Sequence, residues 1–215
     1  MSPRILTVQS RKRSFGAVAT RRLTPRGQER RAQLIDYATG LFASKGYHPT
    51  SVADIVDGLG VGKGVFYWYF SSKEELFVEI LRAAQTDMRR RQQRVLADVV
   101  DPVVRIELGL RAAVLWSAEH HDLFRLFEFA ATDEQFSKSM RAGRATLVND
   151  AVIHLKDAIA EGRIPDGDPE QLAHAILGVS TILTLEYVHQ RGEAPEEIAD
   201  MVVAFCLRGI GVTTP

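Results

Sequence analysis

The chain has 215 residues, 46% of them hydrophobic, which is enough to bury a core as one large or two small domains. Its single cysteine, Cys206, excludes a disulfide framework within one chain and suits a reducing cytosol. Residues 1–20 contain no apolar segment of the kind found in secretory signals, and the longest apolar stretch, about 175–185, is predicted to be too short to span a bilayer. We expect a soluble cytoplasmic protein without a membrane partner.

The net charge is zero, but the charges are distributed unevenly. Residues 1–80 carry 12 Lys and Arg against 7 Asp and Glu, whereas residues 81–215 carry 15 against 20. A basic N-terminal part joined to an acidic remainder indicates that one end meets a polyanion. Chance asymmetry on solvated surfaces is the alternative.

Helix signals begin after residue 23. Thr24 and Pro25 are a typical N-cap and first helical residue, and Gly46 ends the helix that they begin. Ser51 with Asp54 fits a capping box that starts a short second helix. Two further helices are predicted, one from Gly62 to about Phe70 and one over about 72–99, which starts at the capping box of Ser72 and Glu75.

The helical pattern continues to the C-terminus, interrupted by Asp101-Pro102 and by segments rich in Gly and Pro. Helices are expected over about 102–118, 121–131, 134–162, 169–190 and 195–208. No convincing alternating strand and no internal repeat is found. The predicted fold is all-α, with a flexible arm at 1–23, a small helical domain at 24–71 and a larger helical domain at 72–215.

Residues 50–69 have the proportions of a helix-turn-helix, in which two short helices flank a tight turn containing Gly. The apolar residues of this segment can face inward and lock both helices to the first one. The outward face of the second short helix then carries Lys63, Gly64, Tyr67 and Trp68. A helix of about two turns fits the major groove of double-stranded DNA. For Trp68, packing under the long helix is the alternative to bracing a phosphate.

The same segment resembles the TetR family of repressors. The matching residues are Phe42, Gly46-Tyr47, Thr50-Ser51-Val52, Ile55, Gly60-Val61, Lys63-Gly64, Phe66 to Phe70 and Ser72 to Leu76, within about residues 31–81. The resemblance implies a homodimeric regulator, most often a repressor. Its N-terminal helix-turn-helix domain would bind a palindromic operator, and its C-terminal helical domain would bind an effector and dimerise.

The resemblance also implies roles for the outward residues. Lys63 can donate to guanine, Gly64 lets the backbone approach the bases, and Val65 can touch a thymine methyl. Gly62 departs from the Ser or Thr that usually opens the recognition helix, so a side-chain contact there is in doubt. Phosphate contacts are expected from Thr50, Ser51, Tyr67, Tyr69 and Lys73.

The basic arm is a separate hypothesis. Basic arms can enter the minor groove beside a recognition site. The alternatives are a solvated tail or an upstream start-codon artefact. The residues that would make these contacts are Arg11, Lys12, Arg13, Arg21 and Arg22.

Two sites are expected in the C-terminal domain. By resemblance, the last two helices form the dimer interface through Leu172, Ile176, Val179, Leu183, Met201, Val202 and Phe205, with packing inside one subunit as the alternative. A pocket for a small effector, apolar or aromatic because few charges interrupt these stripes, is predicted near Trp116, Phe124, Phe127, Leu147, Leu183 and Tyr187. The alternative for each aromatic residue is a place in the core.

No catalytic, metal or cofactor site is predicted. His120 and His121 are adjacent and therefore point apart on a helix, and nothing near Cys206 would activate its thiol. Residues 58–64 are rich in Gly but lack the spacing of a phosphate-binding loop. The sequence therefore predicts a regulator rather than an enzyme. The alternative is a helical ligand-binding or interaction protein without operator-specific DNA binding.

Overall fold

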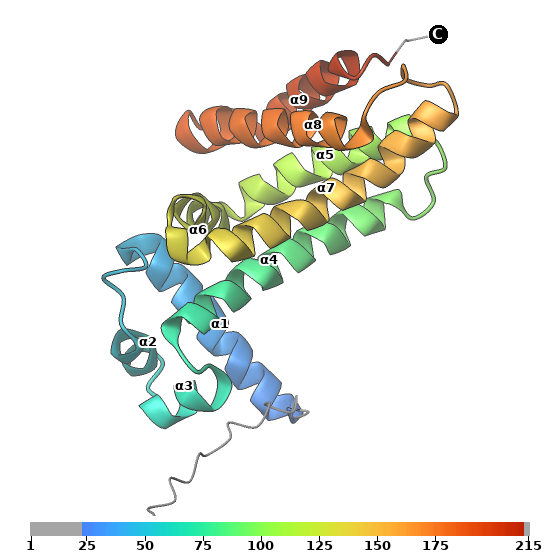
Figure 1. The fold of residues 1–215 in the computed structure, drawn as a ribbon. Coiled ribbons are helices and arrows are strands. Elements are labelled where there is room, and N and C mark those ends of the chain that lie inside the picture. The colour runs from blue at the N-terminus through green and yellow to red at the C-terminus, as the bar shows by residue number, and fades with distance from the viewer. Residues whose placement is uncertain (1–22, 213–215) are drawn as a thin grey trace, which may run out of the picture.

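The computed structural model describes residues 23–212, which form helices and turns without a strand. The helices α1 (Pro25–Lys45), α2 (Val52–Gly58) and α3 (Lys63–Tyr69) make a compact unit, called the head below. The long helix α4 (Lys73–Leu96) leads from the head into the rest of the chain (Figure 1). The remaining helices are α5 (Pro102–Glu119), α6 (His121–Thr132), α7 (Ser137–Ala160), α8 (Pro169–Leu183) and α9 (Pro195–Gly209). The all-α prediction is confirmed.

Local hydrogen bonds explain where the helices begin. The hydroxyl of Thr24 accepts from the backbone N–H of Gly27, and Ser51 and Asp54 form the reciprocal capping box that the sequence predicts. The Ser72 hydroxyl accepts from the N–H of Glu75 at the start of α4. Each such cap stabilises a helix by about 1 kcal/mol. The predicted helix over 134–162 is instead a short 3₁₀ turn, Glu134–Phe136, followed by α7.

One hydrophobic cluster joins the head to α4 and α6. Its largest side chains include Phe66 of α3, Phe70 directly after α3 and Phe77 of α4, together with Phe136 of the 3₁₀ turn. The Phe77 ring lies 4.5 Å from the Phe136 ring and 4.8 Å from the Tyr47 ring, measured between centroids. The first half of α4 therefore shares its core with the head, although the predicted boundary at residues 71 and 72 separates them.

A second cluster, formed mainly by α5, α7, α8 and α9, makes the core of the C-terminal bundle. Cys206 lies inside it, where burial raises the pKa of the thiol to about 11. A thiol in this environment stays protonated and unreactive at neutral pH. In Figure 1, α8 and α9 lie at the opposite end of the molecule from α3.

The helix that begins with α8 is longer than its apolar stretch suggests. A π-helical turn, Thr184–Gln190, continues it, so Pro169–Gln190 forms 22 helical residues. In length and composition this segment could cross a membrane, and the prediction that it is too short is wrong. One face packs into the bundle through Ala173, Ile176 and Ser180. One face of this helix therefore packs into the bundle, and the opposite face is exposed.

Candidate nucleic-acid interface

Two buried aromatic side chains anchor helix α3 to the core of the head. Phe66 and Phe70 face the core of the head, and Gly60 adopts a positive φ of 64° in the turn between α2 and α3. This left-handed conformation is one that glycine adopts without strain. A Cβ atom at Gly58 would lie 1.9 Å from the Tyr37 hydroxyl oxygen, so any other residue there would force the Tyr37 ring of α1 to move. These contacts fix the angle at which α3 presents its outer face.

The outer face of α3 carries the residues predicted to read DNA. Lys63 and Gly64 are exposed, as are Tyr67 at 56% and Trp68 at 64%. The exposure of Trp68 disfavours the alternative that it packs under the long helix. Val65 lies at the edge of this face and is half-buried. The arrangement places a cation, a bare stretch of backbone and two aromatic rings on one side of the helix.

Gly64 has no structural reason to be glycine within the chain. A Cβ atom built there meets no heavy atom within 4 Å, and its φ is not positive. Alanine would favour the helix by up to about 1 kcal/mol. The missing side chain therefore leaves the backbone open to something outside the head. Gly62 is the N-cap of α3 and makes no side-chain cap, as expected.

Tyr69 lies at the junction between α3 and the first turn of α1. It is half-buried, and a Cβ atom at Gly27 would lie 3.6 Å from its hydroxyl oxygen. Its hydroxyl is thus held beside the N-terminus of α1 and stays a candidate phosphate ligand.

The hydroxyls of two expected phosphate ligands form hydrogen bonds inside the head, while the phosphate contact predicted for the backbone N–H groups near them stays a prediction. Thr50 is only 1% exposed, and its hydroxyl donates to the carbonyl of Gly46 at 2.7 Å. The Ser51 hydroxyl donates to Asp54, and hydrogen bonds from Ser51 lower the pKa of the Asp54 carboxyl. This carboxylate occupies the start of α2, where it would repel a phosphate. Thr50 and Ser51 therefore close the loop and cap α2.

Lys73 also forms hydrogen bonds inside the head. Its ammonium donates to the backbone carbonyls of Tyr47 at 2.9 Å and Thr50 at 2.8 Å, and lies 4.2 Å from the centre of the Tyr47 ring. Two of its three N–H groups are therefore engaged within the head. Lys73 therefore ties the loop before α2 to the start of α4, and its predicted contact with a phosphate stays a prediction.

The arm residues Arg11, Lys12, Arg13, Arg21 and Arg22 lie outside the described residues, so the arm hypothesis stays a prediction.

Comparison with known proteins agrees with this geometry. Residues 34–80 match the model for bacterial regulatory proteins of the tetR family. The HTH-type transcriptional repressor KstR2 of Mycobacterium tuberculosis is 36% identical over 92 residues, which cover 43% of this chain and 46% of the repressor. The chain belongs to the TetR family. The match to this repressor spans less than half of its length. KstR2 of Mycolicibacterium smegmatis is 26% identical over 197 residues, covering 84% of this chain and 90% of that one.

Solved structures of TetR-family regulators share the whole fold. The ketosteroid transcriptional regulator KstR2 of Mycobacterium tuberculosis superimposes with a TM-score of 0.66 at 25% identity, covering 85% of this chain and 95% of that one. FadR from Bacillus subtilis, solved in complex with stearoyl-CoA, gives a TM-score of 0.76 at 20% identity, covering 83% and 98%. The relatives named here are transcriptional regulators rather than enzymes, in agreement with the sequence prediction.

The bundle of this TetR-family chain contains a cavity of about 350 Å³ between α4, α5, α7 and α8. Of the six residues predicted to line a pocket, the cavity is lined by Leu147 alone. Trp116 is buried with its indole N–H donating to Asp87 at 2.8 Å, and Phe124 stacks on His189 with 4.0 Å between centroids. The other three, Phe127, Leu183 and Tyr187, pack against the hydrophobic clusters. These five residues do not line this cavity, because they pack against the hydrophobic clusters or, for Trp116 and Phe124, against Asp87 and His189.

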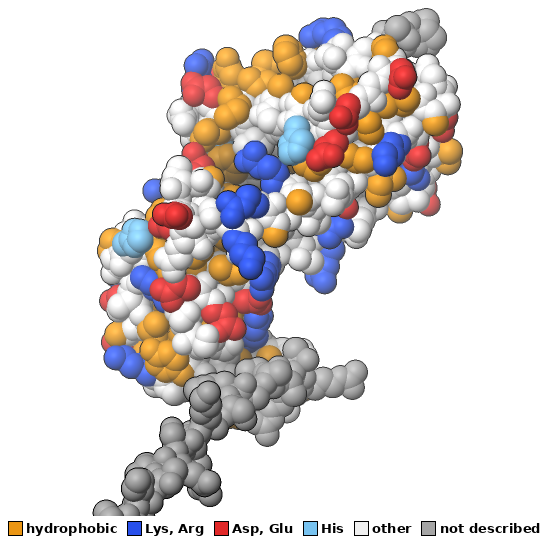
Figure 2. All heavy atoms as spheres, in the orientation of Figure 1, with side chains coloured by type: hydrophobic (Ala, Val, Ile, Leu, Met, Phe, Trp, Pro, Cys, Tyr) orange, Lys and Arg blue, Asp and Glu red, His pale blue; other side chains and the backbone are white. Residues whose placement is uncertain are grey.

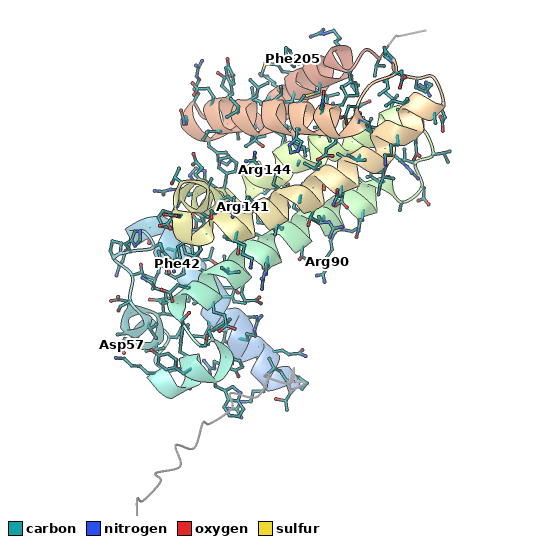
Figure 3. All side chains as sticks on the ribbon, viewed as in Figure 1. Phe42, Asp57, Arg90, Arg141, Arg144 and Phe205 are labelled. Atoms are coloured by element: carbon teal, nitrogen blue, oxygen red, sulfur yellow. The ribbon has the colours of Figure 1, made fainter. Side chains whose placement is uncertain are left out.

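The predicted dimer residues divide between core and surface. Ile176 and Val202 are buried inside one subunit, the latter completely, so their assignment to an interface is wrong. Leu172, Val179 and Leu183 are half-buried against the second cluster. Met201 and Phe205 are exposed on α9, Phe205 at 54%, and Figure 3 shows Phe205 at the outer end of the molecule.

The sequence analysis missed one exposed apolar residue of α8. Ile182 of α8 is 61% exposed and follows Ala175 and Gly178 at helical spacing. That spacing, together with small neighbours, was the signal that could have found it. In Figure 2 hydrophobic side chains gather over α8 and α9. We call the set Ile182, Met201 and Phe205 the α8–α9 patch.

Proposed function

We propose that this chain is a homodimeric transcriptional repressor that binds a palindromic operator through α3 and is released by a small effector. The observation that carries the proposal is the outer face of α3. It exposes Lys63 beside a glycine, Gly64, that the fold does not require. In helix-turn-helix proteins the first residues of such a helix reach base edges in the major groove. Repression is chosen because KstR2, which matches the head at 36% identity, is a repressor.

In this proposal the contacts divide by chemistry. Lys63 reads a guanine, and Val65 meets a thymine methyl. Tyr67, Trp68 and Tyr69 contact the phosphate backbone, which positions the head without reading sequence. Lys73 contributes indirectly, because it holds the loop that supports α2. Because operator DNA lies in the cytoplasm of a bacterium, the proposal includes a cytoplasmic location.

A gel shift with the DNA upstream of the chain's own gene tests the proposal. Lys63→Ala should weaken operator binding by about 1–3 kcal/mol and relax specificity at one base position. Lys156→Ala removes an equally exposed lysine from α7, and should leave binding unchanged. If Lys63→Ala lowers the affinity for all DNA sequences equally, Lys63 does not read a base. The absence of any specific shift by the full chain, over this region and the divergent neighbour, would overturn the proposal.

The dimer is proposed to form through the α8–α9 patch. Helix-turn-helix dimers read two half-sites about one helical turn of DNA apart, so a partner must hold the second head at a fixed distance. The patch exposes three large apolar side chains, and Gly178 has no heavy atom within 4 Å of a built Cβ atom. A second copy could therefore approach α8 closely. Exposed apolar groups of this kind are typical of interfaces.

Light scattering on the purified chain tests the dimer. Phe205→Glu places a charge in the patch and should convert a dimer to a monomer that binds the operator more weakly. Lys156→Glu, on the exposed surface of α7, is the matched control. A wild-type chain that is monomeric at micromolar concentration would contradict the proposed interface.

A further inference from the structure

The cavity between α4, α5, α7 and α8 is elongated along the helices. It is lined by α4 from Arg89 to Ala97, by α5 from Arg105 to Ala113 and by α7 from Leu147 to His154. At 1.5 Å per residue, each stretch is about 10–12 Å long. Most of the wall is apolar, formed by Leu96, Ile106, Leu110, Leu147, Ile176 and Leu177. The space therefore suits an extended apolar group.

The charges at the two ends of the cavity differ. At the end nearer the head, Arg89 donates to Asp150 through Nε at 2.6 Å and Nη2 at 3.0 Å, and these two charges cancel. At the far end, Arg105 donates through Nε to the backbone carbonyl of Val99 at 2.6 Å. Within residues 23–212 no carboxylate forms an ion pair with Arg105. This end of the cavity therefore holds a cation without an ion-pair partner among the described residues, and the carboxylates of Asp150 and Asp157 lie near enough to His154 to act on its pKa in the opposite direction to Arg105.

His154 lies at the same end. Its Nδ1 is buried without a hydrogen-bond partner among the described residues. Burial first, and then the positive charge of Arg105, lower the pKa of its imidazole. An anion placed there would balance Arg105 and could accept a hydrogen bond from the ring. A buried polar group without a partner destabilises the fold, and a ligand that forms the missing hydrogen bond would remove this cost.

We propose that the cavity binds an amphipathic carboxylate of medium chain length, with its carboxylate at Arg105 and His154 and its apolar chain along the wall formed by α4, α5 and α7. A guanidinium matches a planar carboxylate better than it matches a hydroxyl, because it can donate two parallel hydrogen bonds. The apolar wall gives the chain its affinity. This assignment rests on the proposed function, in which the cavity is the effector site, and it replaces the purely apolar or aromatic effector with an anionic one.

Isothermal titration of the full chain with decanoate, decan-1-ol, decyltrimethylammonium and decanoyl-CoA tests the assignment. Decanoate should bind with a Kd about ten- to hundredfold lower than decan-1-ol, the gain expected from one charge-assisted hydrogen-bond pair. Arg105→Gln should raise the Kd for decanoate by a similar factor and leave that for decan-1-ol unchanged. Arg105→Lys keeps a cation and should restore part of the loss. Lys156→Gln, exposed on α7, is the control.

Several outcomes would overturn the assignment. These are equal Kd values for decanoate and decan-1-ol, an equal loss of both in Arg105→Gln, tight binding of the ammonium, binding of decanoyl-CoA alone, or no binding of any probe. A gel shift without ligand, run on the same samples, separates this inference from the proposed function. A chain that shifts its operator but ignores decanoate refutes the ligand alone. A chain that binds decanoate but shifts no DNA refutes the regulator alone.

Discussion

The head and the C-terminal bundle use their polar side chains in opposite ways. In the head, Thr50, Ser51 and Lys73 are all engaged by neighbouring groups of the same unit. In the bundle, Arg105 forms no ion pair among the described residues, and His154 has a buried ring nitrogen without a hydrogen-bond partner there. The head also contains one buried group without a hydrogen-bond partner among the described residues, the Tyr47 hydroxyl, but that group lies in the aromatic cluster, whereas His154 lines a cavity that a ligand could enter. One chain thus combines a DNA-binding head held by internal hydrogen bonds with a cavity whose polar end is open to a ligand.

The largest effect should come from Lys73→Ala, which tests whether the head is internally complete. Loss of two charge-assisted hydrogen bonds to backbone carbonyls should lower the free energy of unfolding by about 2 kcal/mol or more. Urea denaturation measures this change. The salt dependence of operator binding should stay the same, because the ammonium is engaged within the head.

Lys45→Ala is the control for this variant, because Lys45 is exposed at the end of α1. It should lower the stability much less. A fall of about one in the slope of log K against log salt for Lys73→Ala would show that Lys73 does bind a phosphate. That result would restore the role predicted from the sequence and weaken the contrast between head and bundle.

A smaller effect is expected from Gly64→Ala, which separates stability from binding within the head. The substitution should raise the free energy of unfolding by up to about 1 kcal/mol, since a helical glycine is replaced where space is open. The same change should weaken operator binding, because a methyl group would stand between α3 and the bases.

Gly40→Ala is matched to this variant, since Gly40 is also exposed and helical and also has no heavy atom within 4 Å of a built Cβ atom. It should stabilise the chain similarly without affecting DNA binding. Equal operator affinity for Gly64→Ala and Gly40→Ala would show that α3 does not approach the bases at Gly64.

The smallest effect concerns acid and the bundle. His189, in the π-helical turn, lies with its Nδ1 2.9 Å from that of His121 and its Nε2 2.9 Å from the Ser117 hydroxyl. Burial first, and then the nearby His121, lower the pKa of His189 from 6.5 to about 4. The unfolded chain therefore binds a proton at a higher pH than the folded chain, so stability falls as the pH drops from about 6.5 toward 4.

Melting temperatures at pH 7.5 and pH 5 measure this effect. His189→Gln should lose less stability between these pH values than the wild type. Some loss should remain in the variant, because the pKa of His154 is lowered too. His174→Gln, exposed on α8, should behave like the wild type. An identical acid shift in His189→Gln and the wild type would show that His189 does not contribute.

The fold was predictable because its signals are local. Capping residues such as Ser51 and Ser72 act on N–H groups three residues away, and the Gly60 turn and the Phe66 anchor follow from spacing alone. The family resemblance was confirmed on the same short segment. The role of Lys73 was not predictable in this way. Its acceptors lie 23 and 26 residues earlier in the chain, and a lysine gives no sign of whether it faces a carbonyl or a phosphate.

The exposed face of α8 and the cavity in the bundle were not predictable for a different physical reason. Both faces of α8 contain apolar residues, so periodicity alone cannot separate buried Ile176 from exposed Ile182. The aromatic residues chosen for a pocket, such as Trp116, fill the core, because large rings bury the most surface. The cavity was identified only once four helices could be placed around it. Its polar end depends on the juxtaposition of Arg105 and His154, which are 49 residues apart in the sequence.

The aromatic cluster around Phe77 has a consequence for engineering. A chimera that joins this head to another regulator's sensor at residue 72 would remove Phe77, Phe129 and Phe136, whose rings pack beneath Tyr47 and Phe42. In such a hybrid, the aromatic surface of the head around Tyr47 and Phe42 would be exposed to solvent. A transferable unit would have to include the first half of α4, the C-terminal end of α6 and the 3₁₀ turn that holds Phe136. The boundary for exchanging specificity therefore follows the hydrophobic contacts and not the order of the helices.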